Sequence, residues 1–379
     1  ALDAWRRWHV DADYDDLDPA EHRLLPLLLA NLRRLGVDDP VLAHYRRVSR
    51  FFWVRNRMFL VHAARVCREL EGQDIPVLVL KGLPLSLAYY EHAGQRPMND
   101  VDVLVRRRDA SRAVSFLRAK GWSIGNESLR SLEHPERIIR VRHGFNFRHD
   151  AGEQMDLHWA VSRGCLRDTD PLWKHTVTVA SGDTRFRTLD ATGHLLVSID
   201  QSAEWDGMSP IRWLVDACTI VSRTDVDWAR FLAYAEYFDQ VAAAREGLAV
   251  LRALLGVSVP DDVRVALEHR RPRPSTRLDC WLCSRPPLPG VGKILRRYLR
   301  YRRTKPQHGL SFARYLQYFW GLPNRRSALA AAFGNVGIDR RREAANRRRV
   351  AVALAHKAAS RAGGLPADQE SSRSSTARR

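Results

Sequence analysis

The stretch from residue 75 to residue 80 constrains the fold of this chain more than any other. Ile75-Pro76-Val77-Leu78-Val79-Leu80 is a short, uninterrupted apolar run, and Lys81-Gly82 ends it. A run of this length, bounded by polar or turn-forming residues, is typical of a strand that is buried on both faces. Residues 83–92 follow as a predicted short helix with Pro84 in its first turn, where proline is tolerated. The chain therefore changes at residue 75 from helical periodicity to a strand-and-helix pattern.

The residues after this helix predict three more strands and one more helix. Residues 101–105 form a strand in which aspartate alternates with apolar residues, and residues 109–120 form a helix that Gly121 ends. Residues 138–148 and 154–161 are predicted as two further strands. We therefore expect an α+β protein whose small mixed-sheet core, of the kind found in nucleotidyltransferases, spans residues 74–165.

Helical patterns flank this core on both sides. Leucines recur at helical spacing before residue 73, and a second amphipathic pattern spans residues 51–70. Helical periodicity returns after the core, and the Ser/Arg/Gly composition of the last residues argues against a packed structure. The expected organisation is an N-terminal helical region (1–73), the core (74–165), a C-terminal helical region (166–284), a basic helical extension (285–360) after a Pro/Gly-rich linker at 285–290, and a disordered tail (361–379).

The net charge of +19 is concentrated in one part of the chain. Residues 285–379 carry 22 Lys and Arg against 4 Asp and Glu, a net of +18, which leaves the other 284 residues at +1. Such a segment suits nucleic acid, an acidic membrane surface or an acidic protein, or is simply a solvated Arg-rich face. Lys293 to Arg303, with Tyr298 and Tyr301, is the part most suited to bind a polyanion.

Two classes of protein are excluded by composition. No stretch approaches 18 uninterrupted apolar residues, and the first residues lack a basic region followed by an apolar run, so we expect neither a membrane span nor a secretory signal. Five scattered cysteines do not form a disulfide framework, which favours a reducing, cytoplasmic location. The pair Cys280/Cys283 has the spacing of zinc ligands but lacks a second pair, so metal binding and plain packing both stay open.

Three carboxylates lie on predicted strands. Asp100 and Asp102 are two positions apart, so we expect both side chains to project from the same face of one strand, opposite Val101 and Val103. Neighbouring carboxylates repel each other unless a cation lies between them, and Mg²⁺ is commonly held by one or two carboxylates together with substrate phosphates. Asp156, on a later strand, is the natural third carboxylate, either as a metal ligand or as a base for an acceptor hydroxyl.

Several further residues are candidates for the same site. Lys81 and Gly82 lie at a junction between a strand and a helix, where backbone N–H groups and an ammonium group suit phosphate, and Arg96 is a second cation on that side. His158 shares the polar face of Asp156 and is either a proton shuttle or acceptor contact, or a structural residue. Asp216, in an apolar helix, either reaches the site or pairs with an arginine such as Arg212. His143 and His149 lie near a strand without zinc-ligand spacing.

These motifs together resemble a known family. Val79-Leu80-Lys81-Gly82, Arg96-Pro97-Met98-Asn99-Asp100-Val101-Asp102 and Met155-Asp156-Leu157-His158-Trp159 are similar to motifs of the bacterial uncharacterised nucleotidyltransferase family, within the DNA polymerase β-like nucleotidyltransferase superfamily. The resemblance extends to Arg212-Trp213-Leu214-Val215-Asp216 and covers roughly residues 50 to 260. Where the superfamily usually has a Gly-Ser pair, this chain has Lys81-Gly82, with Ser86 one turn further on as another candidate on the phosphate side.

The resemblance implies an activity. The chain is expected to use Mg²⁺, or Mn²⁺, held by Asp100, Asp102 and Asp156, to move an NMP group from an NTP such as ATP to an acceptor, with release of pyrophosphate. The acceptor is a small molecule, sugar, peptide, protein or RNA end, and the sequence does not choose among them. The alternative is a non-catalytic nucleotide-binding or regulatory module whose basic C-terminal helices bind nucleic acid or a protein partner.

Overall fold

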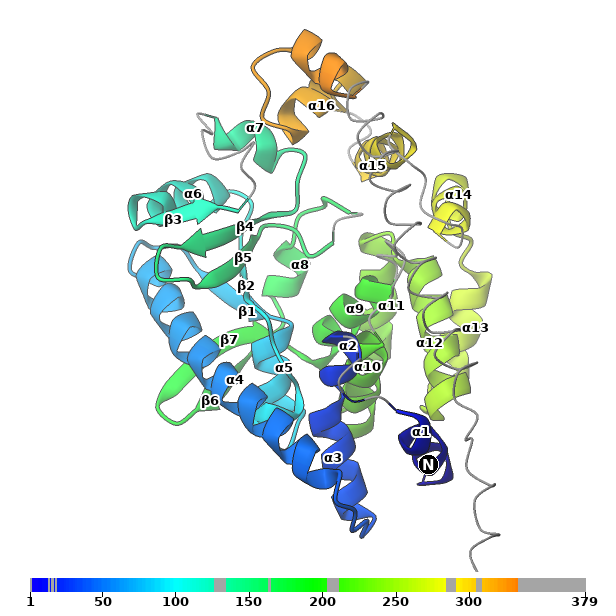
Figure 1. Cartoon of the computed structure of the whole chain (residues 1–379). Helices are drawn as coiled ribbons and strands as arrows, with labels where there is room; N and C mark the ends of the chain where they lie inside the picture. Colours follow the sequence, from blue (N-terminus) through cyan, green and yellow to red (C-terminus); the bar gives the residue numbers. More distant parts are fainter. Residues whose placement is uncertain are drawn as a thin grey trace, which may run out of the picture.

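A computed structural model of the chain describes residues 2–12, 14, 17, 19–125, 134–162, 165–202, 211–283, 291–304 and 309–332. Its centre is a five-stranded mixed sheet with the strand order β1-β2-β5-β4-β3 (Figure 1). Only β2 and β5 run parallel; the other neighbours are antiparallel. The strands are β1 (Val77–Leu80), β2 (Val101–Val105), β3 (Trp122–Ile124), β4 (Gly144–His149) and β5 (Gln154–His158). The sheet and the helices that flank it confirm the predicted α+β class.

Two helices cover the first face of the sheet. The long helix α4 (Leu42–Glu71) crosses this face, and α6 (Ala110–Ala119) packs beside it (Figure 1). Val101, Val103 and Val105 of β2 point into this layer, as the two-residue period of a strand requires. Leu60, Val66 and other apolar residues of α4 complete the core from the helix side. The predicted amphipathic pattern at 51–70 thus lies within one long helix, whose inner face carries Phe52 and Leu60, while Val54, Met58 and Val61 are exposed.

Helices cover the opposite face, and a hairpin packs beside β1. Leu78 and Leu80 of β1 and Leu104 of β2 point to this face, so β1 is buried on both faces, as its continuous apolar run predicts. The covering helices are α5 (Gly82–Ala88), α9 (Ala191–Ser202), α10 (Arg212–Arg223), α11 (Trp228–Tyr237) and α12 (Val241–Leu255). The hairpin of β6 (Thr176–Ser181) and β7 (Thr184–Leu189) contributes Phe186 to the first core and Leu189 to the second. The Thr188 hydroxyl donates to the Val79 carbonyl oxygen at 2.6 Å and fixes the hairpin to the sheet.

The structure differs from the sequence prediction at two places. Residues 138–148 contain the end of a short helix, α7 (Pro135–Ile139), before β4 begins, because Pro135 favours the first turn of a helix. The region predicted as helical from residue 166 begins with α8 (Asp170–Trp173) and the β6–β7 hairpin. Its two strands alternate in exposure, and Gly182 takes the left-handed conformation that its turn needs, with φ at +58°.

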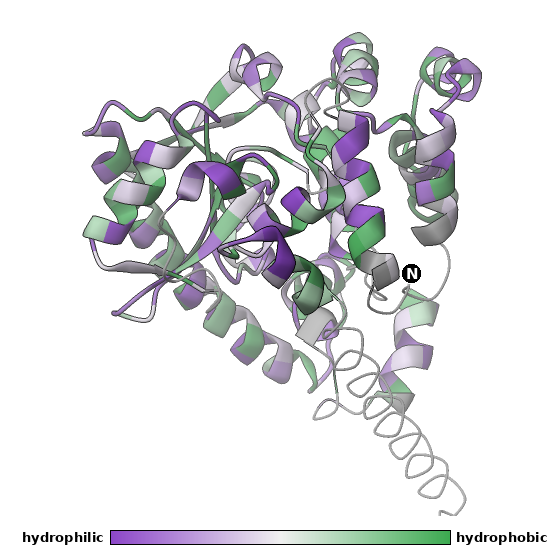
Figure 2. Cartoon of the chain, turned by 90° about the horizontal axis from the view of Figure 1, so that it is seen from above, coloured by the Kyte–Doolittle hydropathy of each residue, from purple (hydrophilic) through white to green (hydrophobic). Residues whose placement is uncertain are grey.

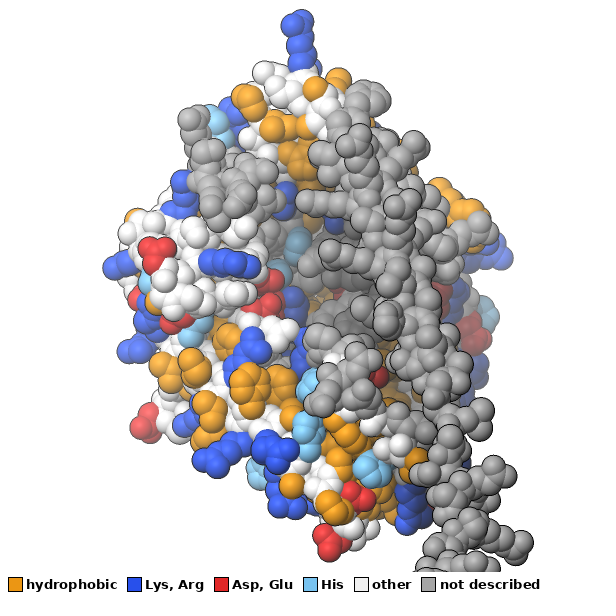
Figure 3. Space-filling view, viewed as in Figure 1, with side chains coloured by type: hydrophobic (Ala, Val, Ile, Leu, Met, Phe, Trp, Pro, Cys, Tyr) orange, Lys and Arg blue, Asp and Glu red, His pale blue; other side chains and the backbone are white. Residues whose placement is uncertain are grey.

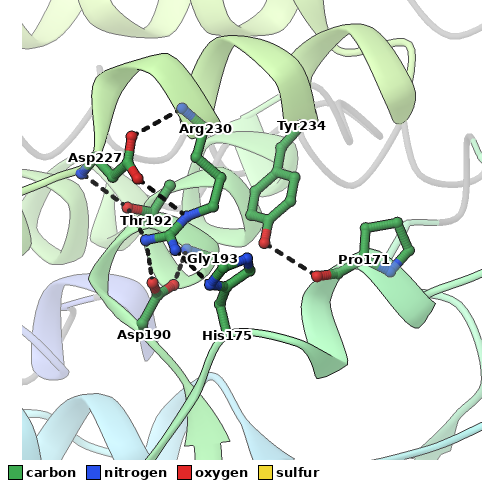
Figure 4. A network of polar contacts seen from close by, with 8 residues as sticks. All are labelled: Pro171, His175, Asp190, Thr192, Gly193, Asp227, Arg230 and Tyr234. Atoms are coloured by element: carbon green, nitrogen blue, oxygen red, sulfur yellow. Dashed lines mark hydrogen bonds and ion pairs between the residues drawn. The ribbon is translucent and has the colours of Figure 1, made fainter.

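A polar network fixes the end of the hairpin to the helices behind it (Figure 4). Asp190 accepts a hydrogen bond from the backbone N–H of Gly193 at 2.9 Å and so caps α9. Asp227 caps α11 in the same way, through the N–H of Arg230 at 2.9 Å. The guanidinium of Arg230 also pairs with Asp190 and contacts His175. Since both caps share one arginine, the starts of α9 and α11 are held together.

The remaining helices form the periphery. Trp5, Leu25 and Tyr45 form a small core between the first helices and α4, and Tyr301, Tyr315 and Leu316 form another at the far end. Many helices alternate hydrophilic and hydrophobic residues along their length (Figure 2), as expected for helices that bury one side. These peripheral elements are α1 (Leu2–Asp11), α2 (Pro19–His22), α3 (Leu25–Arg34), the 3₁₀ turn η1 (Ala93–Gln95), α13 (Asp261–His269), α14 (Pro274–Cys283), α15 (Val291–Thr304) and α16 (Phe312–Phe319).

Among the described residues, none of the helices is both long and apolar enough to cross a membrane. Helices α15 and α16 lie within residues 285–360, the stretch predicted as a basic helical extension. The predicted linker at 285–290 and the predicted disordered tail at 361–379 lie outside the described residues.

Candidate active site

The centre of the site is the pair Asp102 and Asp156. Asp102 lies opposite Asp156 in the parallel ladder of β2 and β5, and opposite Leu80 in the antiparallel ladder with β1. Both aspartates share the sheet face opposite to the valines of β2, so their carboxylates come side by side from neighbouring strands. Asp102 is 5% exposed, and Asp156 is half-buried. This register places Asp156, the predicted third carboxylate, directly beside Asp102.

Two basic side chains engage Asp102. The Lys81 ammonium donates to Asp102 Oδ1 at 2.6 Å, and His158 Nε2 lies 2.9 Å from the same oxygen. Lys81 Nζ and His158 Nε2 are 3.5 Å apart. Burial alone would raise the pKa of Asp102, but the charge of Lys81 and the hydrogen bond from His158 outweigh it and hold that pKa well below its ordinary value. Asp102 is therefore a carboxylate throughout the physiological pH range.

The surroundings of Asp156 and His158 are shaped by β4. Asn146 donates through Nδ2 to Asp156 Oδ1 at 2.6 Å and so orients this carboxylate. Gly144 lies opposite His158, and a Cβ atom there would come within 2.6 Å of the Leu157 carbonyl oxygen and 3.0 Å of His158 Nδ1. His158 Nδ1 is buried and has no hydrogen-bond partner within the described residues. Since Nε2 faces Asp102, we assign the Nε2–H tautomer to a neutral His158.

Asp100 lies directly before strand β2, which begins at Val101. Its charge interacts with those of Asp102 and Asp156, and its place on the same face as Asp102 stays a prediction. Burial, followed by the charges of Asp102 and Asp156, raises the pKa of Asp100 to about 6, against the opposing effect of Lys81 and Arg212. The three carboxylates are therefore close enough to interact, and at Asp100 burial and the charges of the other two outweigh the positive charges nearby.

The loop that carries Asp100 is anchored by buried polar groups. Asn56 of α4 donates to the carbonyl oxygens of Ala93 and Arg96, and its Oδ1 accepts from the Met98 N–H at 3.1 Å. Arg96 is 4% exposed and forms two hydrogen bonds with Asp216, at 2.8 and 2.7 Å. These contacts bind the segment before β2 to helices on both sides of the sheet. Asp216 is thus a structural residue, paired with Arg96 and not with Arg212.

Arg212, the first residue of α10, contacts the same loop. Its NH1 group donates to the Pro97 carbonyl oxygen at 2.9 Å, and its charge acts on Asp100. Burial and the nearby charges of Arg96 and Arg23 lower the pKa of Arg212 to about 10. Asp216 already neutralises Arg96, whereas the positive charge of Arg212 acts on Asp100. The sequence contained this signal only as the motif around Arg212.

Three residues expected on the phosphate side have other roles in the structure. Ser86 is buried, and its hydroxyl donates to the Leu83 carbonyl oxygen at 2.8 Å. Gly82 is also buried, and a Cβ atom there would come within 2.9 Å of the Met98 side chain and 3.1 Å of Arg96 NH1. Arg96 is paired with Asp216, as described above. Phosphate contact by these three residues stays a prediction, and their geometry does not favour it. Lys81, by contrast, lies at the site itself, where its ammonium contacts Asp102.

The donor set suits a divalent cation. One donor atom each from Asp102, Asp156 and His158 lie within 4.8 Å of one another. Carboxylate oxygens suit Mg²⁺ and Mn²⁺, while an imidazole nitrogen suits Mn²⁺ better than Mg²⁺. The Lys81 ammonium already stands against Asp102 as a positive charge, and the raised pKa of Asp100 indicates that more positive charge would stabilise the group. The His143 ring lies 5.5 Å from that of His158 between centroids, tilted by 41°, and is not part of this set.

The other candidates lie away from this centre. Tyr298 and Tyr301 of α15 pack against Tyr315 of α16, so their rings are used inside the protein. A cavity of about 400 Å³ between α14 and α15 is lined by arginines around Asp279, which accepts hydrogen bonds from Arg300 Nε at 2.5 Å and from Arg296 Nε at 2.7 Å. Cys280 and Cys283 lie on α14, and their side chains are outside the described part of the chain.

The chain was compared with known proteins. The family described as uncharacterised nucleotidyltransferase matches residues 20–256. No curated protein matches the chain. The crystal structure of an antigenic nucleotidyltransferase-like protein from Paracoccidioides brasiliensis is similar at 12% identity, with a TM-score of 0.34, over 56% of this chain and 93% of that chain; a likeness this low carries no argument. The family match covers more than half of the residues, and the chain therefore belongs to the uncharacterised nucleotidyltransferase family.

Proposed function

We propose that this protein is an enzyme that transfers an NMP group from an NTP to an acceptor and releases pyrophosphate. The observation that carries the proposal is the register of β2 and β5, which brings Asp102 and Asp156 together on one sheet face. Membership of a nucleotidyltransferase family supports the same reaction class. The site has kept a buried, ionised aspartate, its carboxylate partner and a lysine, which favours catalysis over a degenerate, non-catalytic module.

Asp102 and Asp156 are the proposed metal ligands, with Asp100 as the third. Bound Mg²⁺ or Mn²⁺ would supply Lewis acidity at the phosphorus and neutralise charge on the leaving pyrophosphate. Asp102 is held ionised by Lys81 and His158, so this ligand needs no deprotonation before it binds a cation. Asn146 keeps Asp156 in place through Oδ1 and leaves its second carboxylate oxygen for the cation or for an acceptor hydroxyl.

The phosphate side is assigned to Lys81 and Arg212. Lys81 borders the carboxylates and is the cation nearest to Asp102. Arg212 adds a positive charge beside Asp100 that no carboxylate in the described structure neutralises with a close ion pair. A triphosphate placed between these two cations would bring its α-phosphorus to the carboxylates. His158, with a proton on Nε2 and an unpartnered Nδ1, stands where it would contact the acceptor or shuttle its proton.

The test is a reaction of the purified protein with each labelled NTP in the presence of Mg²⁺ or Mn²⁺. Pyrophosphate release, or labelling of the protein itself, is the expected result. Asp102→Asn should abolish it, whereas Asp150→Asn, at an exposed turn after β4, should leave it unchanged. If the protein binds NTP in a metal-dependent way but shows no turnover with any acceptor added to the reaction, the non-catalytic module is favoured instead.

A further inference from the structure

The outer face of α4 carries a stripe of exposed apolar side chains. Phe51, Val54, Met58 and Val61 recur at intervals of three, four and three residues, so they lie along one side of the helix. Their exposed fractions are 59%, 46%, 67% and 67%. Side chains scattered singly on a surface need no explanation, but a contiguous row of four marks an interaction surface. We call this row the α4 stripe.

Arginines border the α4 stripe. Arg46, Arg50 and Arg57 are exposed and lie along the adjoining side of the same helix. In the space-filling view, hydrophobic side chains gather where Figure 1 draws α4, with basic side chains next to them (Figure 3). Between residues 42 and 68 the sequence has seven arginines and neither Asp nor Glu. The surface is therefore apolar and cationic at once, on a helix of 30 residues.

We propose that the α4 stripe docks on an anionic lipid surface. A helix that lies in a membrane interface inserts an apolar row into the headgroup region, while neighbouring arginines attract acidic lipids. A second copy of this chain is disfavoured because a two-fold contact would place the arginines of both helices against each other. Nucleic acid would pair with the arginines but would leave valine and methionine side chains without an apolar environment. A lipid surface offers acidic headgroups to the arginines and an apolar layer to the α4 stripe.

The same helix links this surface to the site. Its inner side carries Asn56, which fixes the loop leading to Asp100. Docking through the outer side would hold the carboxylate site at a set distance from the lipid surface. The lipid inference stands on the α4 residues alone, and it does not depend on nucleotidyl transfer.

The experiment is co-sedimentation of the full-length chain with vesicles at physiological salt. One set is phosphatidylcholine alone, and the other contains about one third phosphatidylserine. Binding to the acidic vesicles only, with about tenfold weaker binding for the double variants Phe51→Ser/Met58→Ser and Arg50→Gln/Arg57→Gln, is the expected result. The matched control is Leu254→Ser on α12, which removes an equally exposed apolar side chain (68%) at another face and should bind as the wild type does.

Three outcomes would overturn the proposal. Absence of binding to acidic vesicles would leave an acidic protein as the partner of the α4 stripe. Equal binding to both kinds of vesicle would remove the role of the arginines. Binding that persists in both double variants would assign the interaction to the basic residues 285–379. Circular dichroism of each variant shows whether the fold is kept, and the substituted side chains are exposed, so we expect unchanged spectra.

Discussion

Replacement of Asp216 by asparagine should destabilise the protein strongly. Arg96 and Asp216 are both buried, with side chains 5% and 2% exposed, and are joined by two hydrogen bonds. Tyr90 adds a third bond to Asp216 Oδ1 at 2.7 Å. Asp216→Asn leaves the guanidinium charge of Arg96 without a counter-ion in the interior. Removing one partner of a buried pair costs about 3–5 kcal/mol, mostly because the other charge stays unpaired.

The assay is urea unfolding at pH 7, followed by fluorescence. Tyr90→Phe is the matched control, because it removes one hydrogen bond to the same carboxylate and leaves the ion pair, at a cost of about 1.5–3 kcal/mol. The double variant Arg96→Met/Asp216→Leu removes both charges and should be more stable than Asp216→Asn alone. An Asp216→Asn protein whose free energy of unfolding lies within about 1 kcal/mol of the wild-type value would refute this account of the buried pair.

Three further predictions follow from other parts of the site and its support. The variant Lys81→Met should bind Mn²⁺ about tenfold more tightly than the wild type, because the Lys81 ammonium competes with the metal for Asp102. Electron paramagnetic resonance of free Mn²⁺, without nucleotide, measures this affinity, and unchanged or weaker binding would contradict the prediction. Gly144→Ala should cost about 1–3 kcal/mol relative to the wild type in urea unfolding, since its Cβ would meet a backbone oxygen at 2.6 Å; an unchanged free energy of unfolding would contradict it. Burial, followed by the charge of Arg96, lowers the pKa of His194 to about 3, so protonation favours the unfolded chain. The contribution of His194 to stability is full above the unfolded pKa of about 6.5 and falls by up to about 5 kcal/mol as the pH drops towards 3. The variant His194→Gln should flatten this dependence in unfolding curves taken from pH 7 to pH 4.

The strands of the site were predictable because their residue pattern is local. Val77–Leu80 is continuous and apolar, and the two aspartates that face each other sit among apolar residues at two-residue spacing. Whether Asp100 is part of strand β2 was not predictable in the same way. The ladder between β1 and β2 ends with the pair Leu80 and Asp102, so Asp100 has no partner strand. Where a strand begins depends on its neighbours, and a pattern within one segment does not contain them.

The roles of the arginines depend on contacts between distant segments. Arg96 and Asp216 are separated by 120 residues, and Arg212 reaches Pro97 across 115. The sequence indicated that Asp216 needs a cation, because a lone carboxylate in an apolar helix must be paired. It did not distinguish Arg96 from Arg212, since both are arginines near motifs of the site. Only the packing of α10 against the loop decides that Arg96 is neutralised and that Arg212 keeps its charge beside Asp100.

Lys81 shows how the backbone and the charge of the site depend on each other. Its φ is +51° and its ψ −112°, a conformation that a residue with a side chain rarely adopts and that costs about 1–3 kcal/mol. Glycine would remove this strain, yet the chain has lysine here and glycine at the next position, where Met98 and Arg96 leave no space for a Cβ atom. The strained backbone places the ammonium 2.6 Å from Asp102, between the strand end and the helix α5. The strain is kept because the side chain at this point, and not the turn alone, balances the charge of the carboxylates.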